Sequence, residues 1–226
     1  MSEALTFSVD ADNVVSALID TPKDARAGYV LAHGAGAGMA HPFLAAVAAG
    51  LGERGIATFR YQFPYMEKKS GRPDSPKIAE ATVRAAVIEA GRHLKTLPLI
   101  AGGKSFGGRM TSQAEASGHL PGVAGLAFLG FPLHAPGKPS DARAGHLAAV
   151  KVPMLFLQGT RDDFADLALL QPLVKRLGKR VTLHLVDDGD HSFHVRKSSG
   201  RSDAEVMVEL LDTLSAWIDN VVLKAA

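Results

Sequence analysis

The segment at residues 98–108 constrains the fold of this chain most, because an apolar run there leads directly into Gly-x-Ser-x-Gly. A helix is predicted to follow over 109–116. A serine on a sharp turn between a strand and a helix is lifted clear of the sheet, with backbone N–H groups beside its hydroxyl. The two flanking glycines suit such a turn, where a Cβ would strike a neighbouring segment. We therefore interpret Ser105 as a candidate nucleophile; the alternative is a glycine-rich turn with an incidental serine.

Composition limits the classes of protein that remain. The 226 residues, 46% apolar and 21% charged, fit one α/β domain over 1–226. A formal charge of +2 gives no reason to expect a nucleic-acid or membrane-surface partner. The chain has no cysteine, which excludes disulfides, thiolate zinc sites and a cysteine nucleophile. Because no signal segment or membrane-length apolar run is seen, we expect a cytoplasmic location.

Strand and helix patterns alternate along most of the chain. This alternation predicts a mostly parallel, doubly wound sheet of about eight strands with helices on both faces, preceded by an antiparallel hairpin. The expected strands are 5–9, 14–19, 28–32, 56–61, 97–102, 123–131, 152–158 and 181–186. The other expected helices are 42–54, 76–95, 164–177 and one that opens with a capping box at 202–205, while 62–74 is expected to be irregular.

A serine hydroxyl needs a base within hydrogen-bond reach, and the base needs an acid to orient it. In a doubly wound sheet such groups lie at the carboxyl ends of strands. Asp162 follows one predicted strand and His191 follows the last, so the order Ser105, Asp162, His191 is the one expected of this architecture. Asp163 remains the alternative acid, and His194 is the fallback base.

Two backbone N–H groups are needed where negative charge develops on the substrate, each contributing roughly 100- to 1,000-fold in rate. The N–H of Phe106, which follows the candidate nucleophile, is the first. The second is expected from the glycine-rich loop 33–38, with Ala35 as first choice and Gly36 as second. His33 is expected to close its strand rather than to act as a base.

Several basic residues are expected near the strand ends that form the pocket. Gly36, Arg60 and Lys104 are the predicted substrate contacts. We hypothesise that one or more of Arg60, Lys104 and Arg109 attracts an acidic group of the substrate. For Arg109, inside the predicted helix, a solvated side chain or a pair with a local acid is preferred.

With these residues in place, the chain resembles the alpha/beta-hydrolase superfamily over almost its whole length, above all the small lidless branch of dienelactone-hydrolase-like proteins. The runs 33–38, 103–109 and 159–162 are also similar to a set named for a subunit of the non-specific lethal chromatin complex, some of whose members are better known as complex subunits than as enzymes. The resemblance implies a triad of Ser105, Asp162 and His191, with Phe106 and Ala35 supplying the oxyanion hole. The chain departs from true dienelactone hydrolases, which use a cysteine nucleophile.

The resemblance also bears on the shape of the site. The superfamily commonly inserts a cap after the strand that is expected to end near Phe131, but here only 132–150 is available. We therefore predict no cap domain and an open site. The predicted function is a serine hydrolase of small acyl compounds, with a carboxylic ester as first choice and no metal or cofactor. A thioesterase or peptidase with the same triad, and a non-catalytic interaction module, are the alternatives; the oligomeric state is not predicted.

Overall fold

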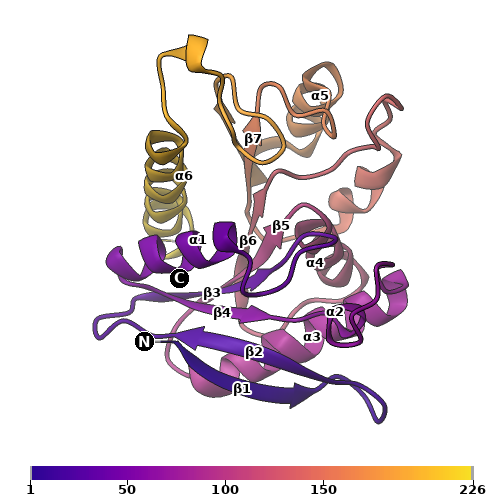
Figure 1. The fold of residues 1–226 in the computed structure, drawn as a ribbon, viewed down its shortest axis with the longest axis vertical. Coiled ribbons are helices and arrows are strands. Elements are labelled where there is room, and N and C mark those ends of the chain that lie inside the picture. Colours follow the sequence, from indigo (N-terminus) through magenta and orange to yellow (C-terminus); the bar gives the residue numbers. More distant parts are fainter. Residues whose placement is uncertain (1, 225–226) are drawn as a thin grey trace.

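The computed structural model describes residues 2–224, which form one eight-stranded sheet with helices on both faces (Figure 1). The strands lie in the order β1-β2-β4-β3-β5-β6-β7-β8. They span Glu3–Ser8 (β1), Val14–Asp20 (β2), Ala27–Ala32 (β3), Ile56–Tyr61 (β4), Leu99–Lys104 (β5), Val123–Leu129 (β6), Met154–Gly159 (β7) and Val181–Val186 (β8). β3 to β8 pair in parallel, whereas β1 pairs antiparallel with β2, and β2 with β4. The predicted fold, with its N-terminal hairpin, is confirmed.

The helices divide between the two faces of the sheet (Figure 1). One apolar cluster joins the sheet to α1 (Pro42–Glu53) and α6 (Asp203–Trp217). The other joins it to α3 (Pro76–His93), α4 (Phe106–Ser117) and α5 (Leu167–Leu177). Because both faces are covered, every residue of β3, β4 and β7 is buried, as expected of a parallel sheet between helices.

The segment after β6 contains no cap domain, as predicted. The connection from β6 to β7 holds only the 3-10 helix η1 (Ala142–Ala149). The site at the carboxyl ends of the strands is therefore left uncovered by any inserted domain.

Helix starts or caps differ from expectation in four places, the first being α4, which begins at residue 106 rather than 109. A short helix, α2 (Pro64–Glu67), forms within the segment predicted to be irregular, with a proline in its first turn. α5 begins at residue 167 rather than 164, because the Asp166 carboxylate caps it by accepting from the Ala168 N–H at 2.8 Å. Ser75 precedes α3 as expected, but its hydroxyl makes no capping bond. The capping box of Ser202 and Glu205 at the start of α6 is confirmed.

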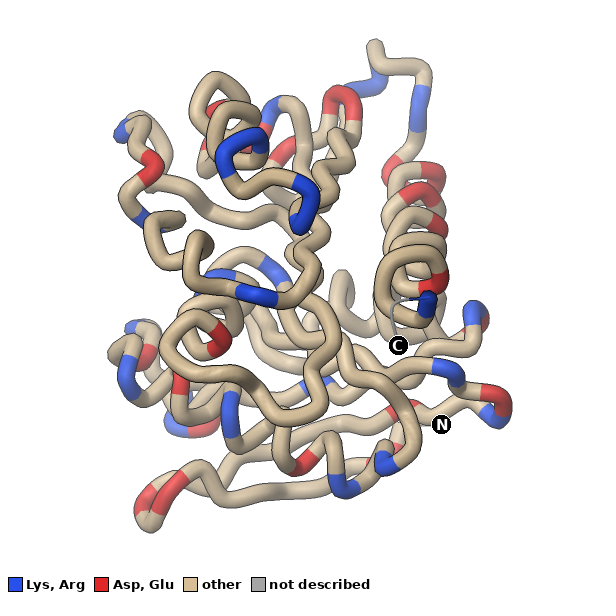
Figure 2. Tube along the Cα trace, turned by 180° about the vertical axis from the view of Figure 1, so that it is seen from behind, with Lys and Arg blue, Asp and Glu red and all other residues tan. Residues whose placement is uncertain are grey.

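Acidic residues line α6 (Figure 2) and face arginines from other elements. Arg54, at the end of α1, pairs with Asp212 at 2.6 Å, and Arg26 pairs with Asp219 just beyond α6, also at 2.6 Å. Such partly exposed pairs each contribute at most about 1 kcal/mol, so α6 is held mainly by its apolar face. No helix within residues 2–224 has the length and apolarity needed to cross a membrane.

Candidate active site

Ser105 lies on a strained turn between β5 and α4. Its φ of 47° is unusual for a residue with a side chain, and such strain is common where a functional group must be held in one position. The turn packs tightly against β3. A Cβ at Gly103 would lie 2.2 Å from the Ala32 carbonyl oxygen, and a Cβ at Gly107 would lie 2.5 Å from the His33 carbonyl oxygen. Glycine at both positions therefore permits the close approach that the sequence predicted.

The structure brings Ser105, His191 and Asp162 together in a hydrogen-bonded series. Nε2 of His191 lies 2.8 Å from Oγ of Ser105, and Nδ1 of His191 lies 2.7 Å from Oδ2 of Asp162. The three residues follow β5, β8 and β7, whose carboxyl ends meet at one edge of the sheet. Nε2 is in position to accept the hydroxyl proton while Nδ1–H donates to the carboxylate.

The Asp162 carboxylate is fully buried and held by two further donors. The Gln158 side-chain amide donates to Oδ2, and the Phe164 N–H donates to Oδ1 at 2.8 Å. Gln158 is itself fixed, because its amide oxygen accepts from the Phe131 N–H at 2.9 Å. The sequence analysis did not select Gln158. A single amide in the otherwise apolar strand β7 was the signal that could have identified it.

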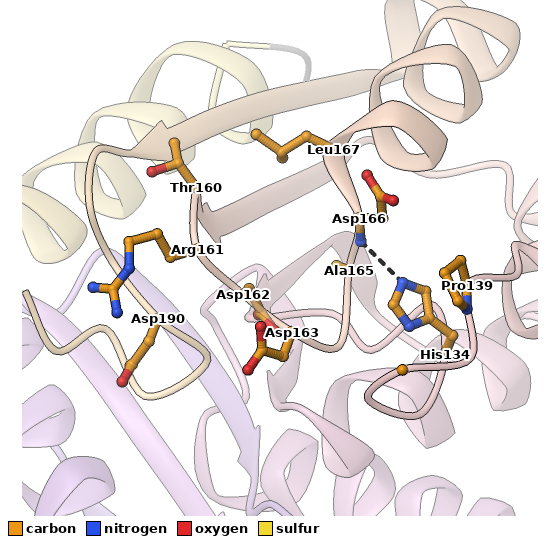
Figure 3. A pocket seen from close by; sticks show the side chains of 11 residues that line it. His134, Pro139, Thr160, Arg161, Asp162, Asp163, Ala165, Asp166, Leu167 and Asp190 are labelled. Atoms are coloured by element: carbon orange, nitrogen blue, oxygen red, sulfur yellow. Dashed lines mark hydrogen bonds between the residues drawn. The ribbon is translucent and has the colours of Figure 1, made fainter.

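The alternative acid and base do not join the hydrogen-bonded series. The Asp163 side chain is exposed and lines a polar pocket of about 630 Å³ that Asp162, Arg161 and Asp190 also line (Figure 3). His194 is also exposed, and its Nδ1 lies 2.6 Å from Asp203. The geometry therefore favours Asp162 over Asp163 and His191 over His194.

The two N–H groups predicted to stabilise an oxyanion are not engaged within the described protein. Within residues 2–224, neither the Phe106 N–H nor the Ala35 N–H donates to a protein acceptor. Ala35 lines the same pocket as Ser105. The N–H of Gly36 instead donates to the Tyr65 hydroxyl at 3.1 Å, and Gly36 does not line that pocket. Of the two predicted loop donors, Ala35 is the one that the structure leaves available.

His33 has a structural position beneath the site. Its buried imidazole accepts the Phe63 N–H at Nε2 over 3.1 Å and contacts the Gly34 carbonyl through Nδ1 at 2.8 Å. Burial lowers the pKa of His33 to about 4, so the ring is neutral at physiological pH.

A second pocket of about 610 Å³ opens beside Ser105. Much of its wall is apolar and comes from the loop after β3 and the first turn of α1. The ring of Phe164 stacks on the His191 imidazole with centroids 4.2 Å apart. The lining residues are Gly34, Ala35, Ala37, His41, Pro42, Phe43, Leu44, Lys104, Ser105, Phe164, His191, Ser192 and His194.

The basic residues predicted to contact substrate have different positions. Arg60 is buried and pairs with Asp20 at 2.9 Å, outside the pocket, so the structure does not support a substrate contact there. The guanidinium instead forms an ion pair between neighbouring strands and donates to the Met39 carbonyl at 3.3 Å. Arg109 is half-buried and also outside the pocket, with Arg143 as a like-charged neighbour. Lys104 does line the pocket, and its ammonium donates to the His191 carbonyl oxygen.

No group of three His, Cys, Asp or Glu residues within 2–224 is placed to hold a metal ion.

Comparisons with known proteins agree with this architecture. Residues 25–219 match the family model described as an alpha/beta hydrolase domain, so the chain belongs to that family. Its fold is similar to that of a dienelactone hydrolase from Anabaena variabilis, with a TM-score of 0.78, 19% identity and 98% of each chain covered. It is also similar to an α/β serine hydrolase without lid from Xanthomonas campestris, with a TM-score of 0.74, 20% identity and coverage of 98% of this chain and 95% of that one. A serine hydrolase homologue from Coxiella burnetii gives a TM-score of 0.74 at 20% identity, covering 95% and 96%.

Proposed function

We propose that this protein is a serine hydrolase of acyl compounds, with a carboxylic ester as its substrate. The observation that carries the proposal is the continuous series from Ser105 Oγ through both nitrogens of His191 to the buried Asp162 carboxylate. Within the alpha/beta-hydrolase family, that series supplies a nucleophile, a base and an orienting acid in the required order.

In the proposed reaction, Ser105 Oγ attacks the ester carbonyl carbon while His191 Nε2 accepts the hydroxyl proton. The Asp162 carboxylate holds Nδ1–H and stabilises the imidazolium that forms. The N–H groups of Phe106 and Ala35 stabilise the tetrahedral oxyanion. His191 then returns the proton to the leaving alcohol as the C–O bond breaks. Water attacks the acyl-Ser105 ester with the same base, which releases the acid and regenerates the hydroxyl.

The shape of the pocket beside Ser105 favours an apolar acyl group of modest size. Phe43 contributes a ring from the first turn of α1, and this ring stacks with that of Phe193 at 6.0 Å. Each methylene that the pocket buries contributes about 0.8 kcal/mol, or roughly fourfold in kcat/KM. We therefore expect kcat/KM to rise from acetyl to longer straight chains until the pocket is full.

A panel of p-nitrophenyl esters of graded chain length tests this proposal. Wild type is expected to hydrolyse them, Ser105→Ala to lose activity, and His191→Ala to lose about 100- to 10,000-fold. A thioester and an anilide of the preferred acyl group distinguish an esterase from a thioesterase or a peptidase. Folded wild-type protein that hydrolyses none of these compounds would favour the interaction module.

A variant of Phe43 tests whether the acyl chain binds in the pocket beside Ser105. Phe43→Ala removes apolar surface that a longer acyl chain would contact, so its kcat/KM should fall more for hexanoyl than for acetyl esters. Equal losses for both chains would place the acyl group elsewhere.

A further inference from the structure

The Lys104 side chain links the nucleophile strand to the loop that carries His191. Lys104 is the last residue of β5 and directly precedes Ser105. Its Nζ donates to the backbone carbonyl of His191 and lies 5.4 Å from the centre of the Phe193 ring. It also passes close to Gly130, where a Cβ would lie 2.9 Å from Nζ. The half-buried side chain therefore lies between the residue that follows β6 and the loop after β8.

The loop that carries His191 has to reach across the sheet. It leaves β8, an edge strand that β6 and β7 separate from β5. Asp188 and Phe193 on this loop both have positive φ, at 56° and 65°. Such backbone persists only where the surroundings hold it. Local contacts anchor the start of the loop to the end of β7: the Asp188 N–H donates to the Thr160 hydroxyl at 2.8 Å, and the Arg161 N–H donates to the Gly189 carbonyl at 2.8 Å.

Those anchors tie the loop to β7, whereas Ser105 directly follows β5. The contact from Lys104 to the His191 carbonyl joins the backbone of the base to the residue beside the nucleophile. The ammonium forms no ion pair with a carboxylate among residues 2–224; Asp162 and Asp190 act on it only from longer range. Its contacts with the described protein are therefore the His191 carbonyl and the Phe193 ring face.

We propose that Lys104 is a positioning residue, whose ammonium fixes the His191 backbone so that the imidazole meets Ser105. This inference rests on the proposed hydrolase function and names a part of the machinery that the triad alone does not include. It differs from the hypothesis that Lys104 attracts an acidic group of the substrate. A positioning role affects every substrate alike, whereas recognition of an acidic group affects only anionic ones.

If the Lys104 ammonium positions His191, loss of its proton should change kcat. Burial lowers the pKa of Lys104 to about 8, with Asp162 and Asp190 opposing the shift. The other titratable groups that line the pocket are His41, His191 and His194. Because the neutral amine loses the charge-assisted bond and the attraction to the Phe193 ring, kcat should fall above a pH of about 8.

The experiment compares wild type, Lys104→Met, Lys104→Arg and a matched control, Lys151→Met. Lys151 is exposed and precedes β7, at the opposite edge of the sheet from the site. Each is assayed from pH 6 to 10 with p-nitrophenyl acetate and with the mono-p-nitrophenyl ester of succinate, which carries a free carboxylate. Lys104→Met should lose about 10- to 100-fold in kcat on both esters with little change in KM, since small misplacements of a catalytic group cost that much. Its fall in kcat above pH 8 should disappear.

Lys104→Arg keeps a cation at all these pH values, so it should recover part of kcat and show no fall near pH 8. The control should match wild type. Unchanged kcat on acetate in Lys104→Met would overturn the proposal, and a loss confined to the succinate ester would establish substrate recognition instead.

A readout that needs no turnover separates this inference from the proposed function. The proton between His191 Nδ1 and Asp162 gives a strongly downfield NMR signal when the pair is ordered. That signal should weaken or shift in Lys104→Met and remain in the control. An unchanged signal would contradict the positioning role, whereas the expected change in a protein that hydrolyses no ester would count against the hydrolase function alone.

Discussion

Replacement of Gln158 by leucine should damage both stability and catalysis. This fully buried amide makes two hydrogen bonds, one as donor to the Asp162 carboxylate and one as acceptor from the Phe131 N–H. Leucine has a similar size and can make neither bond. The variant therefore leaves one buried backbone donor unpaired and removes one donor from a buried charge.

The size of both effects follows from the hydrogen bonds that are lost. An unpaired buried donor costs about 1 to 3 kcal/mol, and a hydrogen bond to a charged group contributes about 1.5 to 3 kcal/mol. Because leucine recovers part of this through apolar burial, we expect the free energy of unfolding to fall by about 3 kcal/mol. If orientation of Asp162 contributes about 1.4 kcal/mol to the transition state, kcat should fall about tenfold.

Urea unfolding measures the first effect, and hydrolysis of p-nitrophenyl acetate by folded variant measures the second. Tyr29→Phe is the matched control, because it removes a buried hydroxyl that donates to the Ala127 carbonyl at 2.8 Å, away from the pocket. The control should lose about 1 kcal/mol of stability and no activity. A Gln158→Leu variant with wild-type kcat would refute the reasoning that Gln158 orients the acid.

Two further predictions concern the packing of the turn and the surface of the site. Gly103→Ala should prevent normal folding, because its Cβ would lie 2.2 Å from the Ala32 carbonyl oxygen. Gly52→Ala is the control: its Cβ would enter open space on α1, so the free energy of unfolding should rise by about 0.5 kcal/mol. Circular dichroism and urea titration measure both outcomes. The hydrogen bond that His194 donates to the Asp203 carboxylate raises the pKa of His194. The Val195 N–H and then His194 lower the pKa of Asp203. The pair therefore stabilises the fold between the two pKa values and loses its contribution as pH rises through that of His194. His194→Gln should therefore reduce stability at pH 5.5 and have little effect at pH 8.5, and equal losses at both would contradict the assignment.

Much of the fold followed from local patterns. Continuous apolar runs such as β7 read as buried strands, and the strand–turn–helix context of Ser105 fixed the edge of the sheet where a site would lie. The boundaries were harder. Asp166 caps α5, so this helix begins three residues later than the sequence predicted. The two candidate acids, Asp162 and Asp163, differ only in the direction in which each side chain points once the turn has formed.

The roles of the basic residues could not be read from the sequence. Arg60 looked like a pocket residue because it lies close to the end of a strand, but its partner Asp20 comes from an antiparallel strand whose register no local pattern reveals. The roles of Gln158 and Lys104 were missed for the same reason. Their partners, Asp162 and the carbonyl of His191, are brought to them only by the tertiary fold.

Reaction with a fluorophosphonate, followed by intact mass measurement and peptide mapping, tests the central claim most directly. The account predicts one adduct per chain on the Oγ of Ser105, none in Ser105→Ala, and much slower labelling in His191→Ala. Folded wild-type protein that stays unlabelled, or that carries its adduct on another residue, would contradict the claim that this hydroxyl is an activated nucleophile.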